Sequence, residues 1–402
     1  MSTTANARLH QRTFHVAPMR DYTNAHFRTI CRIMSKHAVL WGEMEKTGAI
    51  LEADPLKQRR LLQRGSTEGQ EVLQLGGNDP KEMFRAARIC LPYGYDELNL
   101  NCGCPTTKTG GADYGASLMR DAELTSNLIE SIAGGVRGSV AISVKCRIGI
   151  QETYTPDSED YAVLHDYVST LTRTGVLSHV VVHARQAVLG GLSPKQNREV
   201  PPLRHDFVHA LAADFPDLNV TLNGGICRMQ DANMHCAESI KGIMAGRWFL
   251  RSPLDLMRVD EEFYGEASTT SLESVCDAYV DYSLASLERD NGTLAELVMP
   301  LALICYELEE KAKVAVEEGN VEVEARAIRD AELMLETCTP LLMRHHGLKL
   351  SLVSPGQGCF RIWRKALQKL IVEVAKVTFD IGPDHQATIV LMISTCKLVC
   401  DE

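Results

Sequence analysis

The chain has 402 residues, of which 45% are hydrophobic and 23% are charged, and this balance excludes wholesale disorder. Because the net charge is −10, the field of the whole molecule does not favour nucleic acid, and a polyanion would need a local basic patch. No stretch approaches the roughly 18 uncharged apolar residues that a membrane span needs, so we expect no membrane association.

The cysteine content indicates the redox state of the compartment in which the protein works. The chain contains 13 cysteines, an odd number, and it is long enough to form a core without disulfides. A reducing compartment is the simpler interpretation, and we therefore predict a cytoplasmic protein. An organellar location stays open, because Arg8 and Arg12 lie among Ser, Thr and Ala residues with no acidic residue nearby.

From residue 12 to about residue 250, short apolar runs alternate with longer amphipathic stretches. Continuous apolar runs are typical of parallel strands buried on both faces. We predict strands at residues 13–18, 38–43, 70–75, 96–101, 140–146, 178–183, 219–224 and 241–246. Helical patterns lie between them, for example at residues 81–91 and 126–134. Eight such units match the size of a (β/α)8 TIM barrel of about 250 residues, with a doubly wound open sheet as the alternative.

Beyond the last predicted strand, glycine becomes sparse and helical patterns dominate. Residues 301–316 and 322–335 carry apolar residues at helical spacing. We expect Pro300 to open the first of these helices and Pro340 to stop the second. Residues 361–377 form a further basic amphipathic helix.

These patterns predict two domains. Residues 1–258 form the barrel, and residues 259–402 form a smaller all-helical domain. An acidic helical insertion lies around residues 300–342 of the second domain.

In a (β/α)8 barrel the active site gathers at the carboxyl ends of the strands, and the predicted strands end in polar or glycine residues. These strand ends are Ala17-Pro18-Met19, Glu43, Gln74, Asn99 and Asn101, Lys145 and Arg147, His183 and Arg185, Asn223-Gly224-Gly225 and Gly246-Arg247. Glycine lets a ligand approach the backbone, and successive N–H groups can hold a phosphate. Because barrels often bind phosphate after strands seven and eight, the last two strand ends predict a phosphate site. Ordinary tight turns are the alternative.

Three of these side chains suit a flavin. Gln74, Lys145 and His183 offer amide, ammonium and imidazole donors to the oxygen and nitrogen edges of the ring, and a nearby cation stabilises the anionic reduced form. Taken singly, Lys145 could be a solvated lysine at a strand end, and His183 could be a hydrogen-bonded histidine of the core.

The sharpest local motif is Asn101-Cys102-Gly103-Cys104-Pro105. A zinc site needs about four ligands, and because the chain contains no Cys-x-x-Cys pair we predict no metal. Cys102 is interpreted as a core residue. Cys104 lies in a Gly-Cys-Pro turn at a strand end, where a reactive or proton-donating thiol fits.

Longer stretches carry a family resemblance. They are APMRDYTNAHFR (17–28), GEMEKTGAI (42–50), VLQLGGNDP (72–80), YDELNLNCGCP (95–105), YGASLM (114–119), SVKCRIGI (143–150), HARQAVLGGLSPKQNREVPPL (183–203), FPDLNVTLNGGI (215–226) and MAGRWF (244–249). Together they resemble the tRNA-dihydrouridine synthases, and most closely their A-type branch. The resemblance implies a barrel that holds FMN, followed by a helical domain that binds tRNA.

The resemblance also implies a reaction. NADPH reduces the flavin, hydride passes to C6 of a uridine in the tRNA D-loop, and an acid protonates C5. By resemblance the acid is Cys104, as a neutral thiol, and the modified positions are 20 and 20a. The implied flavin contacts are Ala17, Pro18, Met19, Gln74, Lys145 and His183. The implied phosphate contacts are Asn223, Gly224, Gly225, Gly246 and Arg247, and the implied uracil contacts are Asn101 and Arg185.

Nucleic-acid contacts are predicted at two places. Between residues 344 and 372 there are six Lys or Arg residues and no acidic residue. Phosphate contacts dominate nucleic-acid affinity, although a solvated helix face is the alternative interpretation. The predicted contacts are Arg361, Arg364 and Lys365 in this segment, and Lys195, Asn197 and Arg198 in the loop after strand six.

Two other functions stay open. One is a small-molecule flavin reductase of the dihydropyrimidine or dihydroorotate dehydrogenase type, which would need neither the basic helix nor the LSPKQNR loop. The other is a non-catalytic RNA-binding protein that retains the barrel. The residue pattern does not determine the modified uridine, the choice between NADPH and NADH, or the oligomeric state.

Overall fold

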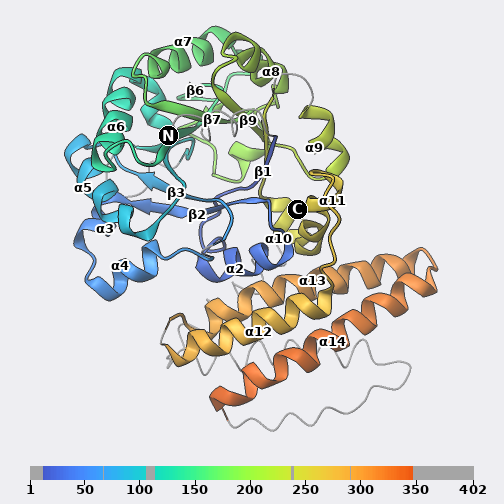
Figure 1. Cartoon of the computed structure of the whole chain (residues 1–402). Helices are drawn as coiled ribbons and strands as arrows, with labels where there is room; N and C mark the ends of the chain where they lie inside the picture. The colour runs from blue at the N-terminus through green and yellow to red at the C-terminus, as the bar shows by residue number, and fades with distance from the viewer. Residues whose placement is uncertain (1–11, 67, 106–113, 237–239, 290, 347–402) are drawn as a thin grey trace. The chain divides into compact units, whose positions relative to one another are not determined.

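The computed structural model describes residues 12–66, 68–105, 114–236, 240–289 and 291–346 (Figure 1). The chain forms two compact units. One contains residues 1–28, 35–248 and 258–267, and the other contains residues 29–34, 249–257 and 268–402. The predicted division at residue 258 stays a prediction. Among the described residues, no helix is long and apolar enough to cross a membrane.

The first unit is built around a closed barrel of parallel strands (Figure 1). Its strands are β1 (Thr13–Val16), β2 (Val39–Lys46), β3 (Glu71–Gly76), β4 (Glu97–Cys102), β5 (Ala141–Arg147), β7 (Leu177–His183), β9 (Asn219–Asn223) and β10 (Gly242–Ala245). Strand β1 pairs with both β2 and β10, which closes the sheet. The predicted (β/α)8 barrel is therefore confirmed, and the open sheet is excluded.

Helices alternate with these strands along the chain. They are α2 (Ala25–Met34), α3 (Thr47–Glu52), α4 (Pro55–Leu62), α5 (Pro80–Cys90), α6 (Ala122–Gly135), α7 (Tyr161–Thr172), α8 (His205–Asp214), α9 (Met229–His235), α10 (Arg247–Arg251) and α11 (Val259–Glu262). Asp79 and Asp121 begin α5 and α6 by accepting backbone N–H groups, as N-cap residues do. Two strands that the sequence pattern did not indicate, β6 (Ile150–Gln151) and β8 (Ala187–Val188), form a small separate sheet.

The interior of the barrel contains both apolar and polar side chains. The apolar cluster consists of Ala17, Val39, Trp41, Val72, Val181 and Met244. Strand β4 contributes polar side chains instead: Glu97, Asn99 and Asn101 are two residues apart and therefore point to the same face of the strand. These polar side chains follow β4 from its first residue to its carboxyl end.

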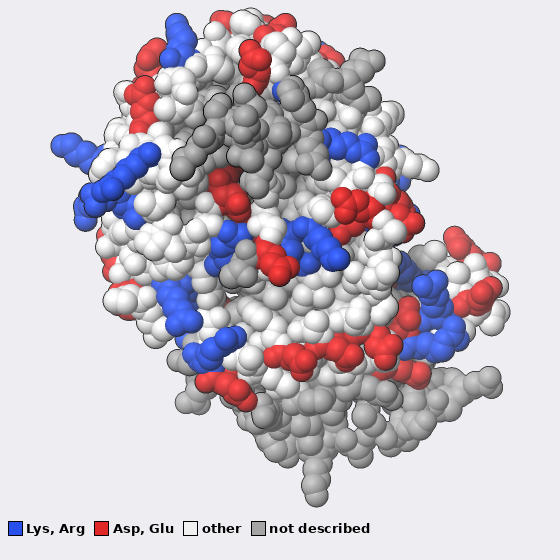
Figure 2. Space-filling view, in the orientation of Figure 1, with Lys and Arg blue, Asp and Glu red and all other residues white. Residues whose placement is uncertain are grey.

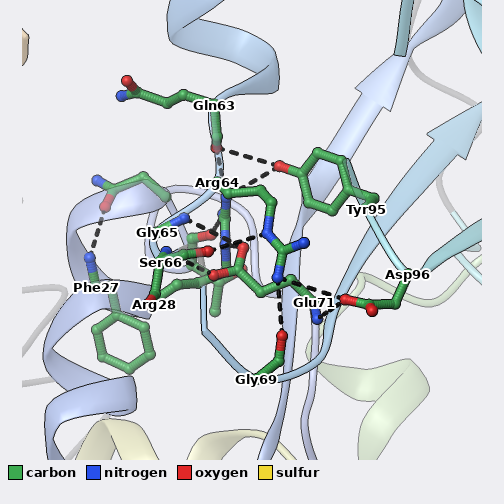
Figure 3. Close-up of polar contacts among 12 residues, drawn as sticks. Phe27, Arg28, Gln63, Arg64, Gly65, Ser66, Gly69, Glu71, Tyr95 and Asp96 are labelled. Carbon is green, nitrogen blue, oxygen red and sulfur yellow. Dashed lines mark hydrogen bonds and ion pairs between the residues drawn. The ribbon is translucent and has the colours of Figure 1, made fainter. Parts of the chain in front are cut away.

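A buried ion pair lies at the start of β3 (Figure 3). Arg28 Nε donates to Glu71 Oε2 at 2.9 Å, and the two side chains are only 5% and 0% exposed. Glu71 also accepts the backbone N–H groups of Gly65 and Ser66. The remaining guanidinium donors of Arg28 bind backbone carbonyls and the hydroxyl of Tyr95. Both charges are thus paired and hydrogen-bonded, as buried charges require.

The second unit contains α12 (Leu272–Glu288), α13 (Leu294–Glu317) and α14 (Val321–His346). The expectation that Pro300 opens a helix is wrong. Helix α13 begins earlier, because Thr293 and Glu296 form a capping box, and Pro300 lies inside it. The stop expected at Pro340 is also wrong, since α14 continues to His346. The predicted basic helix at 361–377 lies outside the described residues.

Candidate active site

The carboxyl ends of β5, β9 and β10 are joined by two hydrogen bonds. Lys145 Nζ donates to Asn223 Oδ1 at 3.1 Å, and Asn223 Nδ2 donates to the carbonyl of Met244 at 2.9 Å. Burial, and secondly the nearby Arg147, lower the pKa of Lys145 to about 8. The Lys145 ammonium group therefore lies at the carboxyl ends of the strands, and it loses its charge at a pH only slightly above neutrality.

His183 ends β7 among several cations. Burial lowers its pKa well below the ordinary value, and Arg147, Lys145, Arg185 and Arg247 lower it further. The imidazole is therefore neutral at physiological pH and has one N–H donor and one acceptor nitrogen. The positive charges around it favour an anionic ligand.

The backbone conformation at the two positions after β9 requires glycine. Gly224 and Gly225 have φ values of +111° and +78°, where side chains other than glycine are strained. A Cβ on Gly224 would lie 2.7 Å from Cδ2 of His183. Consecutive glycine N–H groups beside a group of cations suit a phosphate, so these residues fit a phosphorylated cofactor.

The end of β1 packs closely against the end of β10. A Cβ on Gly246 would lie 3.3 Å from both the Cβ of Ala17 and the Sδ of Met19. Pro18 is half-buried between these two residues in the chain. The structure thus brings the predicted Ala17-Pro18-Met19 segment and Gly246 together at one side of the rim.

The turn that carries Cys104 is held by hydrogen bonds. Asn101 Oδ1 accepts the backbone N–H groups of Gly103 at 3.1 Å and Cys104 at 3.0 Å. Asn101 Nδ2 donates to Gln74 Oε1 at 2.7 Å. Ala116 N–H binds the Cys104 carbonyl, and a Cβ on Gly115 would lie 2.6 Å from that oxygen. Cys104 itself is half-buried, just beyond the end of β4.

Arg147 is a central residue of this site. The sequence analysis placed it at a strand end but gave it no role. Its guanidinium, 4% exposed, donates to the carbonyls of Gly103, Gln186 and Asn197 at 3.1, 3.2 and 3.1 Å. Burial above all lowers its pKa to about 10. Arg147 ties the Cys104 turn to the loop after β7. Its spacing of two residues from Lys145, which places both on one face of β5, was the signal that could have identified it.

The predicted RNA contacts in the loop after β7 differ in their exposure. Asn197 is fully buried, and its amide binds both backbone polar groups of Val188, so its side chain is not exposed for the predicted contact with tRNA. This amide stabilises the loop from within. Lys195 is exposed, Arg198 is half-buried, and Arg185 donates to the carbonyls of Glu199 and Pro201. Arg361, Arg364 and Lys365 lie outside the described residues.

The visible surface of the barrel carries no extended field of one sign. Lys and Arg side chains are interspersed with Asp and Glu across the face in Figure 2. The described residues contain no group of three or more His, Cys, Asp or Glu side chains that could hold a metal ion.

The closed barrel with polar side chains at the carboxyl ends of its strands is the architecture of (β/α)8 enzymes, whose active sites lie at that end. A family model described as dihydrouridine synthase (Dus) matches residues 15–338. The chain belongs to the dihydrouridine synthase family, whose members are flavin-dependent oxidoreductases. This confirms the resemblance seen in the sequence.

Curated relatives agree with this assignment. The tRNA-dihydrouridine(20/20a) synthase of Shewanella oneidensis is 38% identical over 278 residues, which are 69% of this chain and 79% of the relative. The enzyme of that name from Escherichia coli K12 is 37% identical over 280 residues, 70% of this chain and 77% of the relative. That from Pseudomonas putida is 38% identical over 278 residues, 69% of this chain and 79% of the relative.

Proposed function

We propose that this chain reduces the C5=C6 bond of uridine to 5,6-dihydrouridine at positions 20 and 20a of the tRNA D-loop, in the cytoplasm. FMN is the flavin, and NADPH reduces it. The observation that carries the proposal is the Cys104 turn, held by Asn101 and Arg147 beside Lys145 at the carboxyl rim. The names of the relatives support the substrate and the positions.

The rim residues are suited to hold FMN. Gly224, Gly225, Gly246 and Arg247, with the backbone of Asn223, would hold its phosphate by N–H groups and positive charge. Gln74, Lys145 and His183 would face the ring, and Ala17, Pro18 and Met19 would pack against it. When bound, FMN supplies the hydride that C6 of uracil accepts.

Cys104 would donate the proton to C5. The donor has to be a neutral thiol on the face of the uracil opposite the flavin, within hydrogen-bond reach of C5. Asn101 and Arg185 would hold the uracil edge. Because the target uridine stacks within tRNA, it must leave the stack to reach this rim.

Charged residues on two elements would bind the tRNA backbone. Lys195 and Arg198 lie in the loop after β7, and Arg361, Arg364 and Lys365 follow in the C-terminal domain. Asn197 is not part of this set, since its amide is committed to Val188.

Mapping of dihydrouridine in tRNA from cells that lack this protein tests the function. We expect dihydrouridine to disappear at positions 20 and 20a and to return when the gene is restored. Purified protein with FMN and NADPH should restore it to that tRNA. Equal turnover of free uracil would instead identify a small-molecule reductase, and tRNA binding without dihydrouridine would identify an RNA-binding protein.

We expect the affinity for FMN to fall as pH rises through about 8, because Lys145 loses its charge there. FMN carries negative charge and therefore stabilises the ammonium form of Lys145, which raises the pKa of the lysine in the complex. Each unit of this increase makes FMN bind about tenfold more tightly to the charged lysine than to the neutral one. Titrations should run from roughly pH 7 to 9.5, above the phosphate pKa near 6. Lys145→Met should bind FMN weakly, with little dependence on pH in this range. A flat profile for the natural protein would contradict this role.

A further inference from the structure

The segment that enters α8 packs against the two glycines that follow β9. The backbone N–H of Arg204 donates to the carbonyl of Ala184, just beyond the end of β7, at 2.7 Å. The side chain of Leu203 lies against both glycines, since a Cβ on Gly224 would lie 3.0 Å from it and a Cβ on Gly225 would lie 2.7 Å from it. The start of α8 is thereby held beside the predicted phosphate site.

His205, the first residue of α8, binds one of these glycines directly. Its Nε2 lies 2.8 Å from the carbonyl oxygen of Gly224. A carbonyl oxygen can only accept, so Nε2 carries a proton and donates it to this bond. Gly224 is buried and His205 is half-buried, which shields the bond from much of the solvent. The imidazole therefore fixes the direction of the Gly224 carbonyl.

The direction of this carbonyl determines the direction of the next N–H group. The peptide bond between Gly224 and Gly225 is trans, and in a planar trans peptide the C=O and the N–H point in opposite directions. The N–H of Gly225 therefore points away from His205. Within the residues that the structure describes, this N–H has no hydrogen-bond acceptor, so a ligand can use it.

Glycine at both positions also makes this peptide easy to invert. Rotation of the peptide plane by about 180° would change the φ of Gly225 from +78° to about −100°, which glycine adopts equally well. The inverted peptide would turn the Gly224 carbonyl oxygen, instead of an N–H, towards a bound phosphate, and an oxygen with lone pairs repels an anion. The hydrogen bond from His205 favours the orientation that presents the N–H.

We propose that His205 is a positioning residue of the cofactor site, which holds the Gly225 N–H in the direction where it can donate to the phosphate of FMN. Helix α8 lies in the layer of helices outside the barrel, so a group that points away from it is directed towards the carboxyl ends of the strands (Figure 1). This inference rests on the proposed function, which assigns Gly224 and Gly225 to that phosphate.

Comparison of FMN with riboflavin, which is FMN without the phosphate, tests the inference. His205→Phe keeps an aromatic ring but has no donor, so the Gly224 carbonyl loses its partner and the peptide can invert. We expect FMN to bind about tenfold more weakly, as for the loss of one hydrogen bond to a charged group, and riboflavin to bind as it does to the natural protein. His205→Gln, whose Nε2 can take the place of the imidazole Nε2, should restore most of the affinity for FMN. Quenching of flavin fluorescence measures both dissociation constants.

Two further variants separate positioning from packing. His209→Phe is the matched control, because His209 lies one turn further along α8, with its Nε2 3.3 Å from Nδ1 of His235, and it should leave the ratio of the two affinities unchanged. His205→Leu also lacks a donor and decides the question where His205→Phe does not fold.

The ratio of the two affinities distinguishes the possible failures. An unchanged ratio in a folded His205 variant without the donor would overturn the inference. Equal losses for FMN and riboflavin would do the same, because they indicate a structural role. Equal affinity of the natural protein for both flavins, or no affinity for FMN, would instead overturn the phosphate site of the proposed function.

Discussion

Replacement of Cys104 by alanine is expected to lower the rate of dihydrouridine formation about 10²- to 10⁴-fold, the usual contribution of a positioned general acid. The thiol is the group at this turn that can supply a proton to C5, whereas the turn itself is built from backbone N–H and carbonyl groups. FMN affinity and tRNA affinity should stay close to those of the natural protein. Single-turnover assays with FMN-loaded protein measure the rate, and flavin absorbance measures the loading.

Cys102 provides a matched control within the same motif. It is fully buried at the end of β4, and burial raises its pKa far above the ordinary value. Cys102→Ala removes a thiol of equal size and should cost about 1 kcal/mol of packing with little change in rate. Similar losses in both variants, or none in Cys104→Ala, would contradict the role of Cys104 as the acid.

Replacement of Glu71 by leucine is expected to lower the free energy of unfolding by about 3–5 kcal/mol, because it leaves the Arg28 charge buried without its carboxylate. The side chains are 5% and 0% exposed, so water cannot solvate the remaining guanidinium without local opening. The backbone N–H groups of Gly65 and Ser66 would also lose their acceptor (Figure 3). Urea unfolding at pH 7 measures the change.

Two further variants show whether the unpaired charge causes this loss. Glu68→Ala changes an exposed carboxylate three residues away and should stay within about 0.5 kcal/mol of the natural protein. Combining Glu71→Leu with Arg28→Met removes both charges and should recover much of the lost stability. A double variant as unstable as Glu71→Leu alone would attribute the effect to packing rather than to charge.

Local sequence patterns were sufficient to predict the strands of the barrel but not the ends of the helices in the second unit. The strands were predicted to within a few residues, because a parallel strand buried on both faces requires a continuous apolar run that flanking glycines and polar residues interrupt. The rule that proline begins or ends a helix failed at Pro300. The helix begins about two turns before Pro300, where Thr293 and Glu296 form a capping box, and Pro300 inside it lacks one backbone hydrogen bond.

The barrel, the position of Cys104, Lys145 and His183 at strand ends, and the family could all be predicted from the sequence. The first two follow from strand periodicity, and the family follows from stretches of residues that are continuous in the chain. Three features could be seen only in the folded chain: Asn197 is buried, Arg147 joins two loops, and the Asn101 amide is held between the Cys104 turn and Gln74 on β3. The physical reason is that burial and hydrogen-bond direction depend on partners from distant strands, and closure of the barrel is what brings those partners together.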